Sequence, residues 1–273
     1  MATVQALIGI VTIIAAAWLI GGRKPVDRTI VLGGMGLQLL FVILFLKVPY
    51  ANDALAALNQ FVVLLDKATT AGTSFVFGYL GGGELPFEAT NPDRVFILAF
   101  KALPLVIVVS ALSALLFYWR ILPWIIGLFS RLLSRSMGIS GALGLGAAAN
   151  IFVGMIEAPL FIRPYLSKLS RAELFALMTT GMATIAGTMM VLYASILSGI
   201  RDDALGQILS ASVISIPAAL VIALVLVPGN GEDTAAGAEL ESEASSAMDA
   251  ITRGTLQGVI LGSKIVGMLV LLV

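Results

Sequence analysis

Residues 150–166 read NIFVGMIEAPLFIRPYL and place an acid, Glu157, in a strongly apolar stretch. A single smooth helix cannot run through this segment. Pro159 lacks an N–H, and its ring would clash with the carbonyl four residues earlier, while Gly154 adds backbone freedom. We therefore expect a break near 154–158. Pro159 then suits the first turn of a second half-helix, whose positive N-terminal end would lie close to Glu157.

The composition of the chain indicates a membrane protein. Of its 273 residues, 59% are hydrophobic and 12% are charged, and the mean hydropathy is +1.04, which is too apolar for an ordinary soluble domain. Several apolar runs approach or reach the roughly 20 residues that a helix needs to cross the bilayer core. Spans are predicted near residues 2–20, 30–46, 95–119, 174–197, 205–227 and 255–273. Since helices satisfy their own backbone hydrogen bonds, the sequence predicts an all-α integral membrane protein, a polytopic helical bundle.

Charge and residue usage exclude several functional classes. Sixteen basic and sixteen acidic residues give a net charge of zero, which argues against a nucleic-acid partner. The chain has no Cys and no His, so disulfides, thiolate or imidazole metal sites and Ser-His-Asp triads are unavailable. An intramembrane enzyme would need a second acid or another nucleophile beside Glu157. We therefore predict that the protein is not an enzyme.

Weaker segments separate the predicted spans. Residues 52–66 have the apolar spacing of an interfacial helix, 78–92 form a Gly/Pro-rich turn region, and 228–247 are acidic, small and polar. In chain order we expect N-terminal scaffold helices with an interfacial segment (1–92), the third span with a cytoplasmic connection (93–140), a re-entrant hairpin (141–169), a broken fourth span with the fifth (170–227), a polar linker (228–250) and the sixth span (251–273).

Basic residues predict the topology and the hairpin. One group follows the first span, and the other lies between the third and fourth spans: Arg23, Lys24 and Arg28, then Arg120, Arg131, Arg135, Lys168 and Arg171. The positive-inside rule makes both regions cytoplasmic and places the N-terminus outside. Residues 141–166 hold two apolar stretches too short to cross singly, with cytoplasmic residues on both sides. This arrangement predicts a re-entrant hairpin with Glu157 near its tip.

Glu157 is a candidate functional residue. An ionisable group in the membrane costs at least about 2.5 kcal/mol on insertion scales, so function is its default interpretation. Irregular backbone at membrane depth is tolerated only beside protein or a watery cavity, and we expect Glu157 to line such a cavity. The alternative is structural, with Glu157 capping the half-helix or pairing with an Arg of the bundle.

A second discontinuity interrupts the fourth span at GMATIAGTMM, residues 181–190. Gly181, Thr184, Gly187 and Thr188 cluster there at mid-membrane depth. Transporters build midplane binding sites from broken helices that face one another. The alternative is a tightly packed small-residue interface. Together with the hairpin, the segment favours a binding site and predicts a broken transmembrane helix.

Three stretches resemble the concentrative nucleoside transporters: AGTSFVFGYLGG at 71–82, AAANIFVGMIEAPLFIRPYL at 147–166 and ELFALMTTGMATIAG at 173–187. The resemblance covers nearly the whole chain. It implies a bacterial-type, cation-coupled symporter of the inner membrane, a homotrimer with an elevator-like moving domain and nucleosides as substrates. It also implies a second hairpin and two last spans, so this chain looks truncated at its C-terminal end.

The resemblance also implies the substrate site. In the family the first hairpin tip reads Gly-Gln-Thr/Ser-Glu-Ala/Ser-Pro, with the Gln and Thr/Ser on the nucleobase and the Glu on the substrate. This chain has Gly154, Met155, Ile156 and Glu157 there, so two polar positions have become apolar. A carboxylate that accepts hydrogen bonds from ribose hydroxyls remains chemically sound. The predicted substrate-binding residues are Gly154, Met155, Ile156, Glu157 and Met189.

The resemblance implies a sodium site of oxygen ligands, the kind that hard cations favour. Its positions fall on Asn150, Val153, Thr184 and Ile185. Proton coupling through Glu157 is the alternative, and no organic cofactor is expected. A different solute, such as a modified nucleoside, a nucleobase or another small polar molecule, is the alternative substrate. A purely structural membrane protein would not explain an acid at a hairpin tip.

Overall fold

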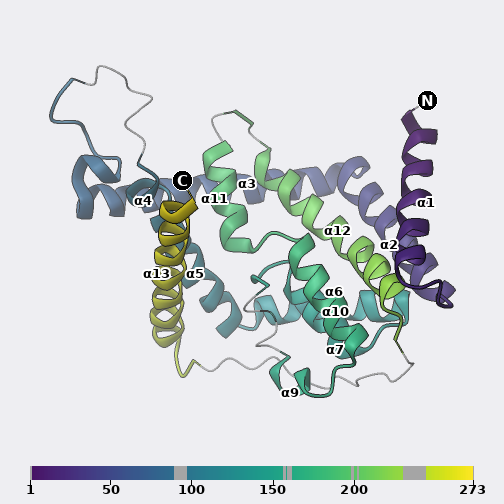
Figure 1. Ribbon diagram of the computed structural model, residues 1–273. Helices are drawn as coiled ribbons and strands as arrows, with labels where there is room; N and C mark the ends of the chain where they lie inside the picture. The colour runs from purple at the N-terminus through teal and green to yellow at the C-terminus, as the bar shows by residue number, and fades with distance from the viewer. Residues whose placement is uncertain are drawn as a thin grey trace. The chain divides into compact units, whose positions relative to one another are not determined.

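The computed structural model describes residues 2–88, 97–155, 158, 162–197, 200–201, 203–229 and 244–272 (Figure 1). Within those ranges the chain forms helices and no β-strand. The helices are α1 (Ala2–Ile20), α2 (Arg28–Lys47), α3 (Pro49–Phe77), η1 (Gly78–Gly81), α4 (Leu98–Lys101), α5 (Leu103–Tyr118), α6 (Ile121–Met137), α7 (Gly141–Ala149), α9 (Arg163–Leu166), α10 (Arg171–Ala183), α11 (Gly187–Leu197), α12 (Ala204–Leu226) and α13 (Ala247–Leu272). The predicted all-α class is confirmed.

Five stretches of the described chain are long and apolar enough to cross a membrane. They are Arg28–Lys47, Leu98–Tyr118, Arg171–Leu197, Ala204–Leu226 and Ala247–Leu272. Each overlaps one of the predicted spans. Ile8–Ile20, within the predicted first span, is a shorter apolar helical segment. The chain is therefore a multi-pass protein of the cell membrane.

Some boundaries differ from the sequence prediction. The segment predicted as an interfacial helix at 52–66 is part of α3, which is a single helix of 29 residues. The predicted cytoplasmic connection before the hairpin contains the 17-residue helix α6, which buries the side chains on one face and exposes those on the opposite face. Helix α13 begins eight residues before the predicted span, because Ser246 caps it by accepting from the Asp249 N–H at 3.1 Å.

The chain folds into two compact units that do not follow chain order. The first unit comprises Met1–Val48, Ile125–Ala186 and Ser210–Glu239. The second comprises Pro49–Trp124, Gly187–Leu209 and Leu240–Val273. The division falls within the break of the predicted fourth span, between Ala186 and Gly187.

The first unit has the small-residue helix α7 in its interior. Residues 142–149 of α7 are all buried. A Cβ atom on Gly144 would lie 2.3 Å from Ser134 Oγ of α6, and one on Gly146 would lie 2.5 Å from Leu177 Cδ1 of α10. Because real Cβ contacts are never this short, glycine is what allows α6, α7 and α10 to approach so closely.

The second unit is built on the contact between α5 and α13, which lie side by side (Figure 1). Gly254 and Gly258 of α13 face α5, where a Cβ on Gly258 would lie 2.6 Å from the Ile107 Cα. A buried cluster of Ala102, Leu103, Val106 and Leu192 adds α11 to this pair. This unit positions the second half of the broken fourth span.

Candidate functional site

The residues predicted as sodium ligands lie at and just after the carboxyl ends of α7 and α10. Helix α7 ends at Ala149 with Asn150 as its C-cap, and α10 ends at Ala183 with Thr184 as its C-cap. Thr184 has an extended backbone (φ −115°, ψ 161°), and α11 begins only at Gly187. The predicted break in the fourth span is therefore confirmed.

The two carboxyl ends meet through a hydrogen bond. The Thr184 hydroxyl lies 3.2 Å from the Asn150 carbonyl oxygen and 3.0 Å from the Thr180 carbonyl oxygen, either of which can accept its proton. A helix carries about half a negative elementary charge at its carboxyl end. Two such ends at one point create a region of negative potential that favours a cation, as in the discontinuous helices of transporters.

The side chain of Asn150 is fixed in one orientation. Its Nδ2 donates to Thr180 Oγ1 at 3.1 Å and to the Leu177 carbonyl oxygen at 3.4 Å. A carbonyl oxygen can only accept, so the NH2 group must face α10 and Oδ1 must point elsewhere. Asn150 is 2% exposed, and within the described residues its Oδ1 has no hydrogen-bond partner. An unsatisfied buried acceptor costs about 1–3 kcal/mol, which a bound cation would offset.

The oxygen atoms at this point fit a monovalent hard cation. Asn150 Oδ1 and Thr184 Oγ1 are uncharged oxygen atoms that can coordinate a cation. The described residues contain no cluster of three or more His, Cys, Asp or Glu side chains that could hold a metal. Calcium and magnesium sites draw on carboxylates. Val153 and Ile185, which the sequence predicts as carbonyl ligands, are partly buried just after the respective helix ends.

Two residues that the sequence analysis did not select support the site. Thr180, fully buried, holds the Asn150 amide, and its own hydroxyl donates to the Leu177 carbonyl at 2.8 Å. Ser212 of α12 accepts the Ile185 N–H at 3.4 Å and so satisfies part of the broken backbone. The sequence could have suggested Thr180, because it lies one helical turn before the predicted ligand Thr184. No local sequence pattern points to Ser212.

Part of the predicted substrate site is described. The Gly154 carbonyl accepts from the Ala158 N–H at 2.9 Å. Met155 is 53% exposed, and its Cβ would lie 2.7 Å from a Cβ on Gly181 of α10. The turn after α7 therefore rests directly on α10 at a glycine. Ile156 and Glu157 lie outside the described residues.

Met189 follows the break and belongs to the second unit. It is partly buried and packs against the cluster of Ala102, Leu103, Val106 and Leu192. Its role as a substrate residue stays a prediction.

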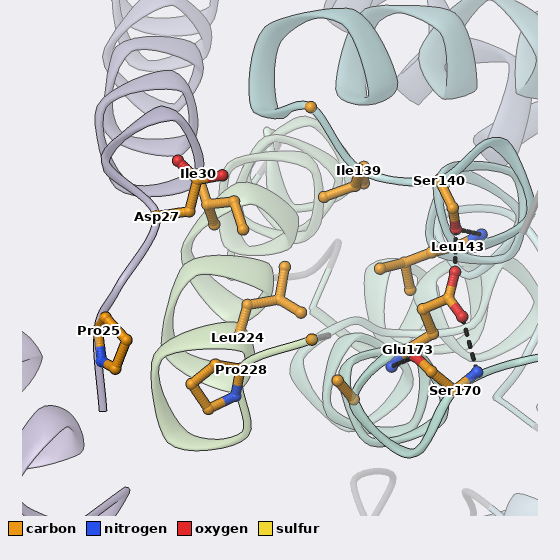
Figure 2. A pocket seen from close by; sticks show the side chains of 13 residues that line it. Pro25, Asp27, Ile30, Ile139, Ser140, Leu143, Ser170, Glu173, Leu224 and Pro228 are labelled. Carbon is orange, nitrogen blue, oxygen red and sulfur yellow. Dashed lines mark hydrogen bonds between the residues drawn. The ribbon is translucent and has the colours of Figure 1, made fainter. Parts of the chain in front are cut away.

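A pocket of about 170 Å³ lies at the other ends of α7 and α10 (Figure 2). Its lining includes Asp27, Ser140, Ser170, Glu173, Leu224 and Pro228. Asp27, Ser140, Ser170 and Glu173 lie at the amino-terminal ends of α2, α7 and α10, and Leu224 and Pro228 lie at the carboxyl-terminal end of α12. The predicted ligands lie at the opposite, carboxyl-terminal ends of α7 and α10. The pocket is therefore distinct from the predicted binding site.

Three family models match successive parts of the chain. The Na+ dependent nucleoside transporter N-terminus model matches residues 8–80, the nucleoside recognition (gate) model matches 99–199, and the Na+ dependent nucleoside transporter C-terminus model matches 207–273. The gate model contains both helix breaks described above.

The chain is also similar to individual transporter sequences and to a solved transporter structure. The nucleoside permease NupC of Helicobacter pylori is 31% identical over 96% of this chain and 61% of its own length. An uncharacterized transporter of Haemophilus influenzae is 35% identical over 84% of this chain and 52% of its own length. The structure of CNTnw in an inward-facing substrate-bound state matches with a TM-score of 0.87 and 29% identity, over 100% of this chain and 63% of that one. The chain thus spans between about half and two thirds of these relatives.

Proposed function

Because the chain belongs to the family of Na+-dependent, concentrative nucleoside transporters, we propose that the protein carries nucleosides into the cell by symport with sodium. The observation that carries the sodium assignment is the buried Asn150 Oδ1, which no described residue satisfies, at the meeting point of two helix carboxyl ends. Asn150, Val153, Thr184 and Ile185 would hold the ion. Sodium would supply a positive charge at this point, and its inward gradient would supply the energy for uptake.

The protein's own residues then have distinct tasks. Thr180 and the Leu177 carbonyl orient the Asn150 amide. Thr184 joins the two helix ends. Glu157 accepts hydrogen bonds from the ribose hydroxyls, which are stronger than neutral contacts because the acceptor is charged. Gly181 seats the turn that leads to Glu157.

The mechanism and assembly belong to the same proposal. The division into two compact units, with the predicted sodium ligands in the first, supports an elevator-type alternating access in which one unit moves as a body. The family resemblance supports a homotrimer.

Asn150→Ala tests the sodium site. The variant loses the unsatisfied acceptor and the bonds to α10. We expect the sodium concentration for half-maximal thermal stabilisation of the purified protein to rise about tenfold or more, because a lost hydrogen-bonding group of this kind is worth on the order of 1–3 kcal/mol. Thr179→Ala is the control, since Thr179 is partly buried on the same helix and its hydroxyl donates to the Phe175 carbonyl of its own helix turn at 2.8 Å. An unchanged sodium midpoint in Asn150→Ala would reject the site. A wild-type protein stabilised by protons and not by sodium would favour the alternative coupling ion.

Met155 and Ile156 suggest a second candidate substrate, a modified nucleoside or a nucleobase. Met155 is half-exposed at a position where the family has a polar base contact. We expect Met155→Gln with Ile156→Thr to shift uptake by the full-length protein toward common nucleosides, because the new side chains can pair with base edges. Competition by a nucleoside panel against labelled uridine measures the shift. Met178→Gln, at an exposed methionine of α10, controls for added polarity. If the double variant Met155→Gln with Ile156→Thr had the same competition profile as the Met178→Gln control, the side chains at 155 and 156 would not face the base.

A further inference from the structure

Glu173 is a buried carboxylate far from the predicted ligands. It is 7% exposed and lies in the first turn of α10, at the edge of the pocket (Figure 2). One carboxylate oxygen accepts from the Ser170 N–H at 2.7 Å, and the Ser170 hydroxyl accepts from the Glu173 N–H, which completes a capping box. The other oxygen accepts from the hydroxyl of Ser140.

The contact with Ser140 joins α10 to α7. Ser140 is the N-cap of α7, and its Oγ accepts from the Leu143 N–H at 3.3 Å. Figure 2 shows the Glu173 side chain pointing between Ser140 and Ser170, so that one carboxylate connects the N-caps of both helices. A capping box needs only the bond to Ser170. The bond to Ser140 therefore calls for a separate explanation.

The two helices are parallel and held in register at both ends. Asn150 follows Ser140 by ten residues, and Thr180 follows Ser170 by ten residues, so each pair is about 15 Å apart along its helix. At the carboxyl ends Asn150 donates to Thr180, and at the amino ends Ser140 donates to Glu173. The helices thus have matched lengths between two polar contacts.

Helix α7 has few side chains that could fix its position along the axis, although the Ser134 hydroxyl of α6 also donates to the Ser140 carbonyl at 3.5 Å. Its sequence, GALGLGAAA, has only two large side chains. It therefore has few side chains that could fit into the grooves of a neighbouring helix. Buried packing on all sides prevents lateral movement, so the polar contacts at its two ends are suited to set its register along the axis. Buried polar groups that fix register are a documented use of such contacts in helical assemblies.

We propose that Glu173 is a positioning residue for the sodium site: through Ser140 it sets the axial register of α7 against α10 and so holds Asn150 Oδ1 at the right place beside Thr184. The proposal rests on the proposed function for the identity of the ion. The register itself is independent of that identity, and the two can be tested separately.

The first experiment uses matched glycine variants of the full-length protein and reads sodium-dependent thermal stabilisation. Ser140→Gly removes the hydroxyl that bonds Glu173, and Ser170→Gly removes the cap hydroxyl of α10 while leaving the Ser140–Glu173 bond. Glycine is a tolerated N-cap residue, so both variants should fold. We expect the sodium midpoint to rise about tenfold in Ser140→Gly and in Glu173→Ala, and to stay within about twofold of wild type in Ser170→Gly. Glu173→Gln, which can still bond both serines, should restore most of the affinity.

The double variant Ser140→Gly with Glu173→Ala tests whether the two residues act through one bond. We expect its sodium midpoint to be no higher than that of either single variant, because the same contact cannot be lost twice. The proposal would be overturned if the increases in the sodium midpoint of the two single variants multiplied in the double variant. It would also be overturned if Ser140→Gly and Ser170→Gly raised the midpoint equally.

The second experiment reads the register without sodium. Spin labels are attached at Met155→Cys and Met182→Cys, which are exposed positions after α7 and near the end of α10. Residues 1–273 contain no other cysteine, and any cysteine elsewhere in the protein is first replaced. We expect one narrow label separation in the otherwise wild-type protein and in Glu173→Gln, and a broadened one in Glu173→Ala and in Ser140→Gly. An unchanged separation in both of the latter would overturn the register proposal, whatever the ion. A wild-type protein indifferent to sodium would instead refute the proposed coupling and leave the register result standing.

Discussion

Gly181→Ala is expected to raise the sodium concentration for half-maximal stabilisation by about 5- to 150-fold and to reduce nucleoside uptake at ordinary sodium to a small fraction of wild type. The added Cβ would lie 2.7 Å from Met155 Cβ, 3.4 Å from Met155 Cα and 3.5 Å from Asn150 Nδ2. Atoms so close to the backbone cannot rotate away, so the turn at 154–155 must move off α10. Overpacking of this kind costs typically about 1–3 kcal/mol, which sets the expected range. Sodium titrations of the purified variant and uptake into proteoliposomes measure both effects.

Gly36→Ala is the matched control for this substitution. Gly36 lies inside α2 of the same unit, and a Cβ there would meet nothing within 4 Å. Alanine in a helix interior is favoured over glycine, so this variant should bind sodium as wild type does and melt no earlier. If Gly181→Ala also titrated like wild type, the close approach of the turn to α10 would be irrelevant to the site.

Glu157→Gln is expected to abolish concentrative uptake by the full-length protein while leaving its abundance and its stabilisation by sodium unchanged. The substitution keeps the side-chain volume and removes the charge. Hydrogen bonds to a charged group contribute about 1.5–3 kcal/mol, against about 1 for neutral ones, so two ribose hydroxyls together lose on the order of 100-fold in affinity. Sodium-driven accumulation of labelled uridine and adenosine measures the loss.

Glu84→Gln controls for removal of an acidic charge, because Glu84 is exposed in the turn after η1. It should transport as wild type does. Normal uptake by Glu157→Gln would refute its role as ribose acceptor. Loss of the sodium response in the same variant would show that Glu157 serves the sodium ion as well as the substrate.

The features that the sequence predicted correctly are local ones. The apolar runs are long enough to identify the membrane-length helices, and the cluster at 181–190 located the break between α10 and α11. Hydropathy and helix-breaking residues act over a few turns, so they can be read without knowing the fold. The start of α13 and the full length of α3 were missed, because polar caps and amphipathic segments fall below a hydropathy threshold.

Hydropathy and helix breakers predict an all-helical membrane protein with a broken fourth span, and the family resemblance adds Asn150 and Thr184 as candidate ligands. The tertiary structure adds that the Thr184 hydroxyl meets the Asn150 carbonyl and that Thr180 orients the Asn150 amide, which leaves Oδ1 without a partner among the described residues. It also adds that Ser212 of α12 bonds the backbone after the break in the fourth span. It also decided that Glu173, which reads locally as half of a capping box, holds a second helix. Periodicity and propensity describe a helix alone, whereas the partner of a buried polar atom depends on which helices pack together and in what register.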